Sequence, residues 1–101
     1  MKWNLDITEK RICGATNWKS FNELTELEDK SGVYIFANNQ LHLKYIGVFK
    51  TKSSLLEIND ALKKGLGFNA SLVKVLYTNT KNEAIALHNN IIELYQPVNN
   101  K

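Results

Sequence analysis

Residues 32–47 read GVYIFANNQLHLKYIG, two apolar runs rich in β-branched and aromatic residues with ANNQ between them. Runs of this composition predict two antiparallel strands, and the Asn-Asn pair predicts a tight two-residue turn because asparagine tolerates a positive φ. With that turn, Tyr34 faces Leu43 across the hairpin, and Tyr45 lies two positions further along the same face. The hairpin is therefore expected to present two phenol rings side by side, whereas a slip of one residue would send one ring to the opposite face. The same spacing also fits two aromatic core residues.

Three helix starts are marked by capping boxes, in which a hydroxyl at the N-cap and a carboxylate three residues later satisfy free backbone N–H groups. An apolar pattern of helical spacing follows each box. We therefore expect a short helix after residue 20, a second over about residues 55–64 and a third over about residues 81–95. The boxes are Ser20 with Glu23, Ser54 with Glu57, and Thr80 with Glu83. The side chains expected to face inward are Leu55, Ile58 and Leu62 in the second helix, and Ala84, Leu87, Ile91 and Leu94 in the third.

A third long strand is predicted over residues 72–77, LVKVLY, which are apolar and β-branched. The order along the chain is then a helical preface followed by ββαβα. We expect one compact α/β domain of the α+β type, in which a small three-stranded antiparallel sheet is flanked by helices. Residues 1–30 form an N-terminal extension with the short helix, and residues 31–101 form the main unit. An edge strand at the start is predicted from the alternation of Trp3, Leu5 and Ile7.

The composition favours a folded domain without covalent cross-links. The chain has 101 residues, of which 44% are hydrophobic, enough to bury a core. Its single cysteine, Cys13, excludes an intramolecular disulfide and favours a reduced, cytoplasmic compartment. Cys13 is expected to be a small, semi-buried hydrophobe rather than a nucleophile. No apolar run is long enough to cross a bilayer or has the form of a signal peptide, so we expect no membrane partner.

Positive charge is concentrated in the middle of the chain. Residues 44–81 contain seven lysines and two acidic residues, a local charge of +5, while the flanking parts are each slightly acidic. Such clustering favours a phosphate-bearing partner, and it fits a solvated lysine-rich surface equally well. Arg11 is the only arginine, so bidentate guanidinium contacts with phosphate are scarce.

The tripeptides GVY, ending at Tyr34, and YIG, starting at Tyr45, resemble the two name-giving motifs of the GIY-YIG nucleases, with eleven residues from tyrosine to tyrosine. The predicted helix, third strand and final helix, and the ending PVNN at residues 97–100, follow in that family's order. The resemblance covers about residues 31–100. It implies a GIY-YIG-like fold and a relation to enzymes that hydrolyse phosphodiesters.

In that family, hydrolysis uses both tyrosines, an arginine on the following helix and a glutamate on a later helix that holds a divalent metal ion. A phenol helps to deprotonate the attacking water, a guanidinium grips phosphate oxygens, and the metal stabilises developing charge. The tyrosines match Tyr34 and Tyr45. The arginine position, about ten residues past the second tyrosine, carries Leu55, and the glutamate position carries His88. The resemblance thus implies an impaired catalytic set, with Mg²⁺ or Mn²⁺ bound only if the chain is active and no other cofactor.

The remaining polar residues of the last helix are not expected to restore a metal site. His88 lies about 60° from the centre of the apolar stripe, and a single imidazole without a second ligand at helical spacing rarely holds a metal. Glu83 is explained as a capping residue, and Glu93 points to the opposite side. His42, the other histidine, alternates with its neighbours so that it faces away from the tyrosines.

Three functions remain open. We predict a catalytically impaired GIY-YIG-like domain that binds nucleic acid through a lysine-rich face around the tyrosines. The alternatives are a protein-interaction or regulatory module, such as an inhibitor or accessory subunit that uses this face or Trp3 and Trp18, and an active metal-dependent endonuclease with a rearranged site. The lysines expected to contact nucleic acid are Lys44, Lys50, Lys52, Lys63 and Lys64.

Overall fold

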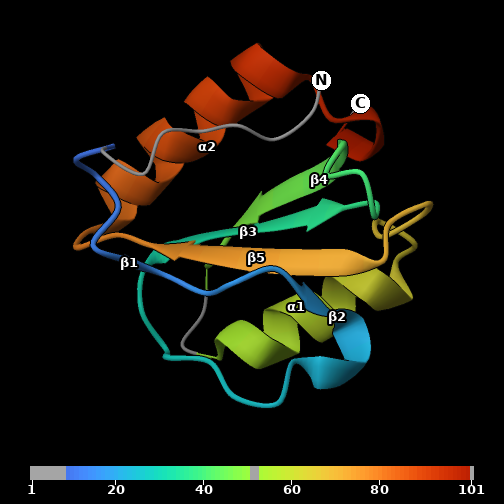
Figure 1. Cartoon of the computed structure of the whole chain (residues 1–101). Helices are drawn as coiled ribbons and strands as arrows, with labels where there is room; N and C mark the ends of the chain where they lie inside the picture. Colours follow the sequence, from blue (N-terminus) through green and yellow to red (C-terminus); the bar gives the residue numbers. More distant parts are fainter. Residues whose placement is uncertain (1–8, 51–52, 101) are drawn as a thin grey trace.

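The computed structural model describes residues 9–50 and 53–100. Strand β3 (Gly32–Ala37) lies at its centre. Strand β4 (Leu43–Val48) pairs with one edge of β3 and strand β5 (Leu72–Tyr77) with the other, so every residue of β3 is buried (Figure 1). Both pairings are antiparallel. The other elements are β1 (Gly14–Ala15), β2 (Lys19–Ser20), the 3₁₀ turn η1 (Phe21–Glu23), α1 (Ser54–Lys63), α2 (Lys81–Tyr95) and the 3₁₀ turn η2 (Val98–Asn100).

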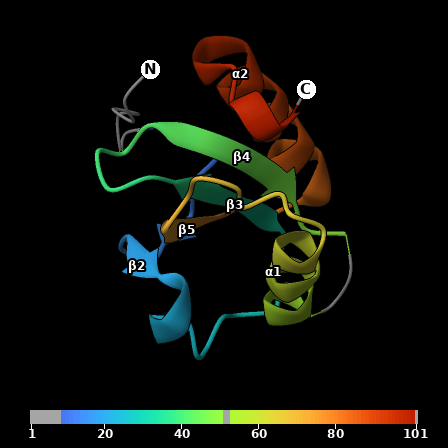
Figure 2. The same ribbon diagram turned by 90° about the vertical axis from the view of Figure 1, so that its right-hand side faces the viewer.

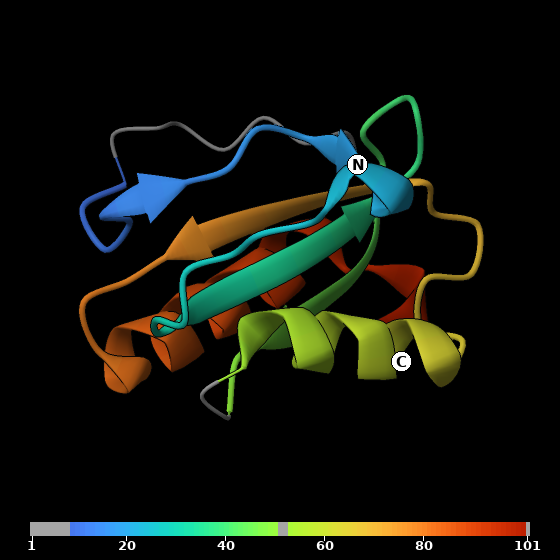
Figure 3. The ribbon, with the colours of Figure 1, turned by 90° about the horizontal axis from the view of Figure 1, so that it is seen from below.

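The sheet has five strands in the order β1-β5-β3-β4, and β2 also pairs with β5. The predicted α+β architecture, an antiparallel sheet flanked by helices, is confirmed. The predicted sheet of three strands is extended by β1 and β2, which come from the N-terminal segment and run beside β5 (Figure 3). Strand β4 lies at the opposite end of the strand order and pairs only with β3 among the described strands.

One helix covers each face of the sheet (Figure 2). Alternation along β3 divides its side chains, with Val33 and Ile35 in the cluster beneath α2, and Tyr34 and Phe36 in the cluster beneath α1. Burial on both faces explains why the strand is almost uniformly apolar. The α2 cluster also contains Leu43, Ile46, Leu76, Ala84, Leu87, Ile91 and Tyr95. The α1 cluster also contains Phe49, Ile58, Ala61, Val73, Val75 and Tyr77.

The predicted two-residue hairpin turn is wrong. Residues 38–42 form a longer loop, in which the Asn38 side chain accepts hydrogen bonds from the backbone N–H groups of Gln40 and His42, and Leu41 has a φ of 62°. An asparagine that bonds the backbone two residues on stabilises a loop of this kind in competition with the tight turn. The pairing is also irregular between Phe36 and the next residue of β3.

Tyr34 consequently lies opposite Gly47 rather than Leu43, and Phe36 lies opposite Tyr45. The register differs from the predicted one by four residues along β4. Because strand side chains alternate with a period of two, an even shift keeps the tyrosines on one face. Their predicted juxtaposition is therefore confirmed although the predicted register is not.

Helix α1 starts differently from the prediction. Its N-cap is Ser53, and Ser54 is the first helical residue rather than the cap. The Ser54 backbone N–H donates to Asp29 Oδ1 at 3.0 Å, and its hydroxyl donates to the Glu28 carbonyl at 3.1 Å. The Ser54/Glu57 capping box is thus wrong, because a distant segment supplies the acceptor at this helix end. The buried residues are Ser54, Ile58 and Ala61, while the predicted inward residues Leu55 and Leu62 are half-buried.

Helix α2 agrees with its prediction at both ends. Thr80 is the N-cap and its side chain accepts from the Glu83 backbone N–H, as expected. Gln96 takes a left-handed conformation at the C-cap, and Pro97 follows. Leu94, expected inside, is 56% exposed. The buried residues are Ala84, Leu87, Ile91 and Tyr95.

The N-terminal segment contributes packing as well as strands. The Ser20/Glu23 capping box is present, but it starts a 3₁₀ turn of three residues instead of a longer helix. Leu24 and Leu27 still pack against the α1 cluster from an irregular segment. The edge strand predicted at Trp3, Leu5 and Ile7 falls outside the described residues. Cys13, predicted to be semi-buried, is exposed. Within the described ranges, no helix has the length and apolar character required to span a membrane.

Candidate functional site

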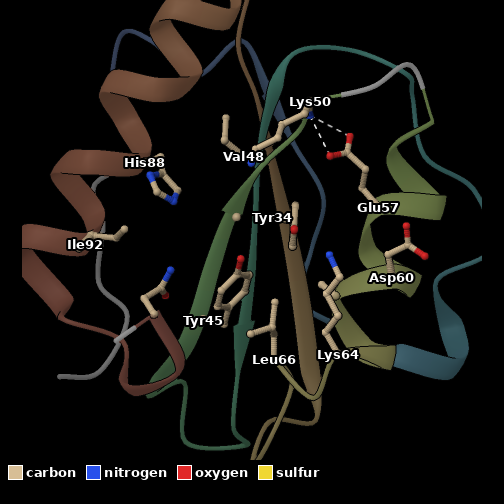
Figure 4. A pocket seen from close by; sticks show the side chains of 13 residues that line it. Tyr34, Tyr45, Val48, Lys50, Glu57, Asp60, Lys64, Leu66, His88 and Ile92 are labelled. Carbon is tan, nitrogen blue, oxygen red and sulfur yellow. Dashed lines mark hydrogen bonds between the residues drawn. The ribbon is translucent and has the colours of Figure 1, made fainter.

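A cavity of about 530 Å³ lies around β4, between residues of α1 on one side and residues of α2 on the other (Figure 4). Strands β3 and β4 form its floor, the turn after α1 and the C-terminal residues form part of its wall, and its volume lies in the range of small-molecule sites. The cavity is lined by Tyr34, Tyr45, Gly47, Val48, Lys50, Glu57, Asp60, Ala61, Lys64, Leu66, His88, Ile92 and Asn100.

The two motif tyrosines meet in this cavity. Their ring centroids are 6.1 Å apart with an interplanar angle of 43°, within the range of favourable aromatic pairs. The Tyr34 ring lies across Gly47, since a Cβ atom at residue 47 would be 2.2 Å from Tyr34 Cζ. Glycine at this position of β4 therefore leaves space for the Tyr34 ring, which extends from β3 across β4.

The environment of Tyr34 disfavours its ionisation. Burial raises the pKa of the Tyr34 hydroxyl above its usual range, and Tyr45 raises the pKa further, as do Glu57 and Asp60. Tyr34 is only 6% exposed. At neutral pH this hydroxyl is protonated, so it can donate a hydrogen bond but is poorly suited to accept a proton from water.

Helix α1 and its C-cap border the cavity with a polar stripe made of Glu57, Asp60 and Lys64. Both carboxylate oxygens of Glu57 accept from the Lys50 backbone N–H, at 2.8 and 2.9 Å. Sequence reasoning missed the two acidic residues because Glu57 was interpreted as a helix cap. The spacing of these residues, three and seven positions along one flank of a helix, is the signal that could have grouped them.

His88 lines the cavity from α2, where it is half-buried, and its Nδ1 lies 3.3 Å from Asn89 Oδ1. Figure 4 shows His88 on the opposite side of β4 from Glu57 and Asp60. His42 does not line the cavity, as predicted, but the reason differs, because it is exposed in the hairpin loop rather than placed in a strand. The imidazole and the carboxylates thus border the tyrosines from opposite sides.

Asn100 closes the cavity near the C-terminus. Its side-chain oxygen accepts from the Ile46 backbone N–H at 2.9 Å, and its amide nitrogen donates to the Ile46 carbonyl at 2.8 Å. The two bonds satisfy backbone groups of β4 that β3 leaves unpaired. This residue belongs to the PVNN ending, but its position in the site was not predicted.

The predicted lysines divide into two groups. Lys50 and Lys64 line the cavity, whereas Lys44 and Lys63 do not, and Lys52 lies outside the described residues. Leu55, which was assigned to the arginine position by counting from Tyr45, is half-buried and does not line the cavity either. The residues of α1 that line the cavity are instead 57, 60 and 61, and Lys64 joins them from the C-cap of the helix.

The cavity residues fit a divalent metal ion poorly. Over residues 9–50 and 53–100, no three histidine, cysteine or acidic side chains gather closely enough to hold a metal. Glu57 already binds the Lys50 backbone N–H with both oxygens, and His88 lies across β4 from the two acids. A hard cation such as Mg²⁺ needs several oxygen ligands around one point, and this arrangement does not bring them together.

No protein-family model and no curated protein matches this chain. Among solved structures, it is similar to the GIY-YIG N-terminal endonuclease domain of UvrC from Thermotoga maritima, crystallised with its catalytic divalent cation, magnesium. The match has a TM-score of 0.62 and 26% sequence identity, and it covers 73% of this chain and 86% of that chain. This chain therefore has the small α+β fold of a GIY-YIG domain, an antiparallel sheet with two helices.

Proposed function

We propose that this chain is a nucleic-acid-binding module with a GIY-YIG fold that does not cleave phosphodiesters by the metal-dependent mechanism of that family. The observation that carries the proposal is the composition of the cavity. It keeps the paired phenols of Tyr34 and Tyr45 and two lysines, but it lacks an arginine, and in the part of the chain that the structure describes no group of side chains could hold a metal ion.

The proposed loss of cleavage is supported by the charges beside the tyrosines. Glu57 and Asp60 repel a phosphate on the α1 side of the cavity, and the raised pKa of Tyr34 makes its phenolate, the form that would accept a proton, harder to form. The Lys50 backbone N–H, a donor that could bind a phosphate oxygen, is taken by Glu57. Each of these features acts against the negative charge that develops during phosphodiester hydrolysis.

Binding is supported by the lysines and by the similarity to an endonuclease domain. Lys50 and Lys64 border the cavity, and Figure 4 shows the Lys64 side chain extending from α1 toward the tyrosines. Lysines beside aromatic rings that border a groove are a usual composition of nucleic-acid-binding sites. The basic middle of the chain, residues 44–81, adds a long-range attraction for polyanions.

The binding test compares labelled oligonucleotides by fluorescence anisotropy at about 50 and 200 mM salt. We expect affinity to fall with salt, and Lys64→Glu to weaken binding several-fold. Lys81→Glu is the matched control, because Lys81 is an exposed lysine at the start of α2 that does not line the cavity. Affinity that does not depend on salt, or equal losses in both variants, would overturn the cavity as the binding site.

The cleavage test incubates supercoiled plasmid with the protein and Mg²⁺ or Mn²⁺. We expect no nicking above that of a buffer control. Metal-dependent nicking that disappears in Tyr34→Phe would establish an active endonuclease with a rearranged site and contradict the proposal. The phenylalanine variant keeps the buried ring that lies over Gly47, so it is a suitable test of the hydroxyl alone.

A further inference from the structure

We propose that the cavity receives an unpaired base of single-stranded nucleic acid that carries an exocyclic amino group, and that backbone phosphates remain at its lysine rim. This inference rests on the proposed function and specifies which part of the nucleic acid enters the cavity. It concerns the centre of the cavity around Tyr34 and Tyr45, where the surrounding charge decides which group can bind.

The charges favour an uncharged hydrogen-bond donor at this centre. Glu57 and Asp60 both line the cavity on its α1 side, and their negative charge reaches the Tyr34 hydroxyl, whose pKa they help to raise. A phosphate placed there would meet like charge. A base amino group would instead find a carboxylate acceptor, as when Asp or Glu accepts from cytosine N4.

Asp60 is the carboxylate available to a ligand. The two oxygens of Glu57 are held by the Lys50 backbone N–H, which fixes that side chain on the wall of the cavity. The Asp60 side chain is exposed and, in the part of the chain that the structure describes, accepts no hydrogen bond. An exposed carboxylate on the α1 wall of the cavity can therefore receive a donor without breaking an internal bond.

The tyrosines supply the surface against which a base can stack. Tyr45 is half-buried, its ring packs on Phe36 at 5.8 Å and on Tyr34 at 6.1 Å, and it also borders the cavity. Figure 4 shows the Tyr45 ring open to the cavity. Bases of unpaired strands stack on such rings, whereas bases inside a duplex cannot reach them without being flipped out.

The lysines are placed to hold the backbone rather than the base. Lys50 follows β4 and Lys64 follows α1, so they border the cavity from two different segments. Lysine contacts with phosphates fix the position of a strand and carry no sequence information. Sequence preference then depends on the acidic side chains, and cytosine and adenine should be preferred over thymine, which lacks an exocyclic amino group.

The test measures binding of unpaired oligo(dC), oligo(dA) and oligo(dT) of equal length, and of a duplex, by fluorescence anisotropy at pH 7.5. We expect oligo(dC) and oligo(dA) to bind about tenfold more tightly than oligo(dT), and the duplex to bind more weakly than either. Asp60→Ala should remove this preference by weakening oligo(dC) and leaving oligo(dT) unchanged or stronger. Glu93→Ala is the control, since Glu93 is exposed on α2 and does not line the cavity.

The outcomes separate the two proposals. Equal, salt-dependent binding of oligo(dC) and oligo(dT) would overturn base recognition while leaving the nucleic-acid-binding function in place. A preference for oligo(dC) that persists in Asp60→Ala would overturn the role of the carboxylate and with it this inference. Failure to bind any oligonucleotide would reject the proposed function itself.

Discussion

Gly47 shows how one residue sets the position of the two motif tyrosines. A Cβ atom at this position would lie 2.2 Å from Tyr34 Cζ and 2.3 Å from its hydroxyl oxygen, closer than real contacts allow. The Tyr34 ring is also packed on Phe36, Tyr45 and Phe49, at centroid distances of 5.6, 6.1 and 5.1 Å, so it has little room to withdraw. The absence of a side chain at residue 47 is therefore a requirement of the aromatic packing.

Gly47→Ala should accordingly displace Tyr34 and destabilise the fold by about 1–3 kcal/mol, the usual cost of overpacking a dense core. The free energy of unfolding in urea measures this effect. Gly14→Ala is the matched control, because its Cβ would meet Tyr77 Cδ2 at an ordinary 3.7 Å. A Gly47→Ala protein as stable as the Gly14→Ala protein would show that Tyr34 can move aside freely.

At this scale the sequence could predict the paired phenols but not all of the side chains around them. The pairing of the tyrosines was predictable because side chains alternate between the two faces of a strand. The longer hairpin loop shifts the register by an even number of residues, so both rings stay on the same face. Glu57 and Asp60 were missed because acidic residues on a helix flank have several ordinary explanations. Only the approach of α1 to β4 in three dimensions shows that they border a cavity.

Among the elements, helix α1 depends on a segment far away in sequence. Its first turn is held by Asp29, whose carboxylate accepts from the Ser54 backbone N–H, and by the Glu28 carbonyl, which accepts from the Ser54 hydroxyl. The segment that carries these acceptors is itself attached to β5, because the Glu28 backbone N–H donates to the Tyr77 hydroxyl at 3.1 Å. The start of α1 and the end of β5 are thereby connected.

Asp29→Ala is expected to destabilise the protein by about 0.5–2 kcal/mol, since it removes both the hydrogen bond and the negative charge at a helix N-terminus. Asp29→Asn keeps an oxygen acceptor and should lose less. Thermal unfolding followed by circular dichroism measures both, with Glu26→Ala as a control on the same exposed segment. Equal stability of the alanine variant and the control would mean that the Asp29 bond contributes nothing in solution.

The elements themselves were largely predictable, and the exceptions have a common cause. The long strands and both α-helices follow from local composition and periodicity, which is why their ranges agree closely with the structure. The predicted cap of α1 was wrong because Asp29, rather than the local Glu57, accepts the hydrogen bond from the Ser54 backbone N–H. Glu57 accepts from the Lys50 backbone N–H instead. A local pattern cannot show that a better partner arrives from another part of the chain.

Across the whole molecule, the N-terminal segment is part of the sheet and of the core beneath α1. β1 and β2 pair with β5, and Phe21 packs edge-to-face on Phe36 with centroids 5.3 Å apart. The Lys74 ammonium adds a further link, donating to the Thr16 carbonyl at 2.7 Å. The sequence could predict that this segment contains apolar residues, but two-residue strands leave no periodic pattern by which to recognise them.

A chain that begins at Ser31 should therefore lose stability, with a thermal midpoint lowered by more than about 10 °C, because it exposes the apolar face beneath α1 and an unpaired edge of β5. Binding of an apolar dye and thermal unfolding test this together. Phe21→Ala in the full chain should give an intermediate loss, which separates the apolar contact from strand pairing. An unchanged midpoint in the shortened chain would show that residues 31–101 form a self-sufficient unit.

The side chain of Asn100 affects whether two copies of this protein can pair through the outer edge of β4. By both donating to and accepting from Ile46, it presents to β4 the same pair of bonds that a neighbouring strand would offer. At Ile46, the outer edge of β4 therefore has no free backbone N–H or carbonyl to offer to an extended segment of another molecule. Because unpaired edge strands favour aggregation, we expect Asn100 to oppose the pairing of two copies along this edge.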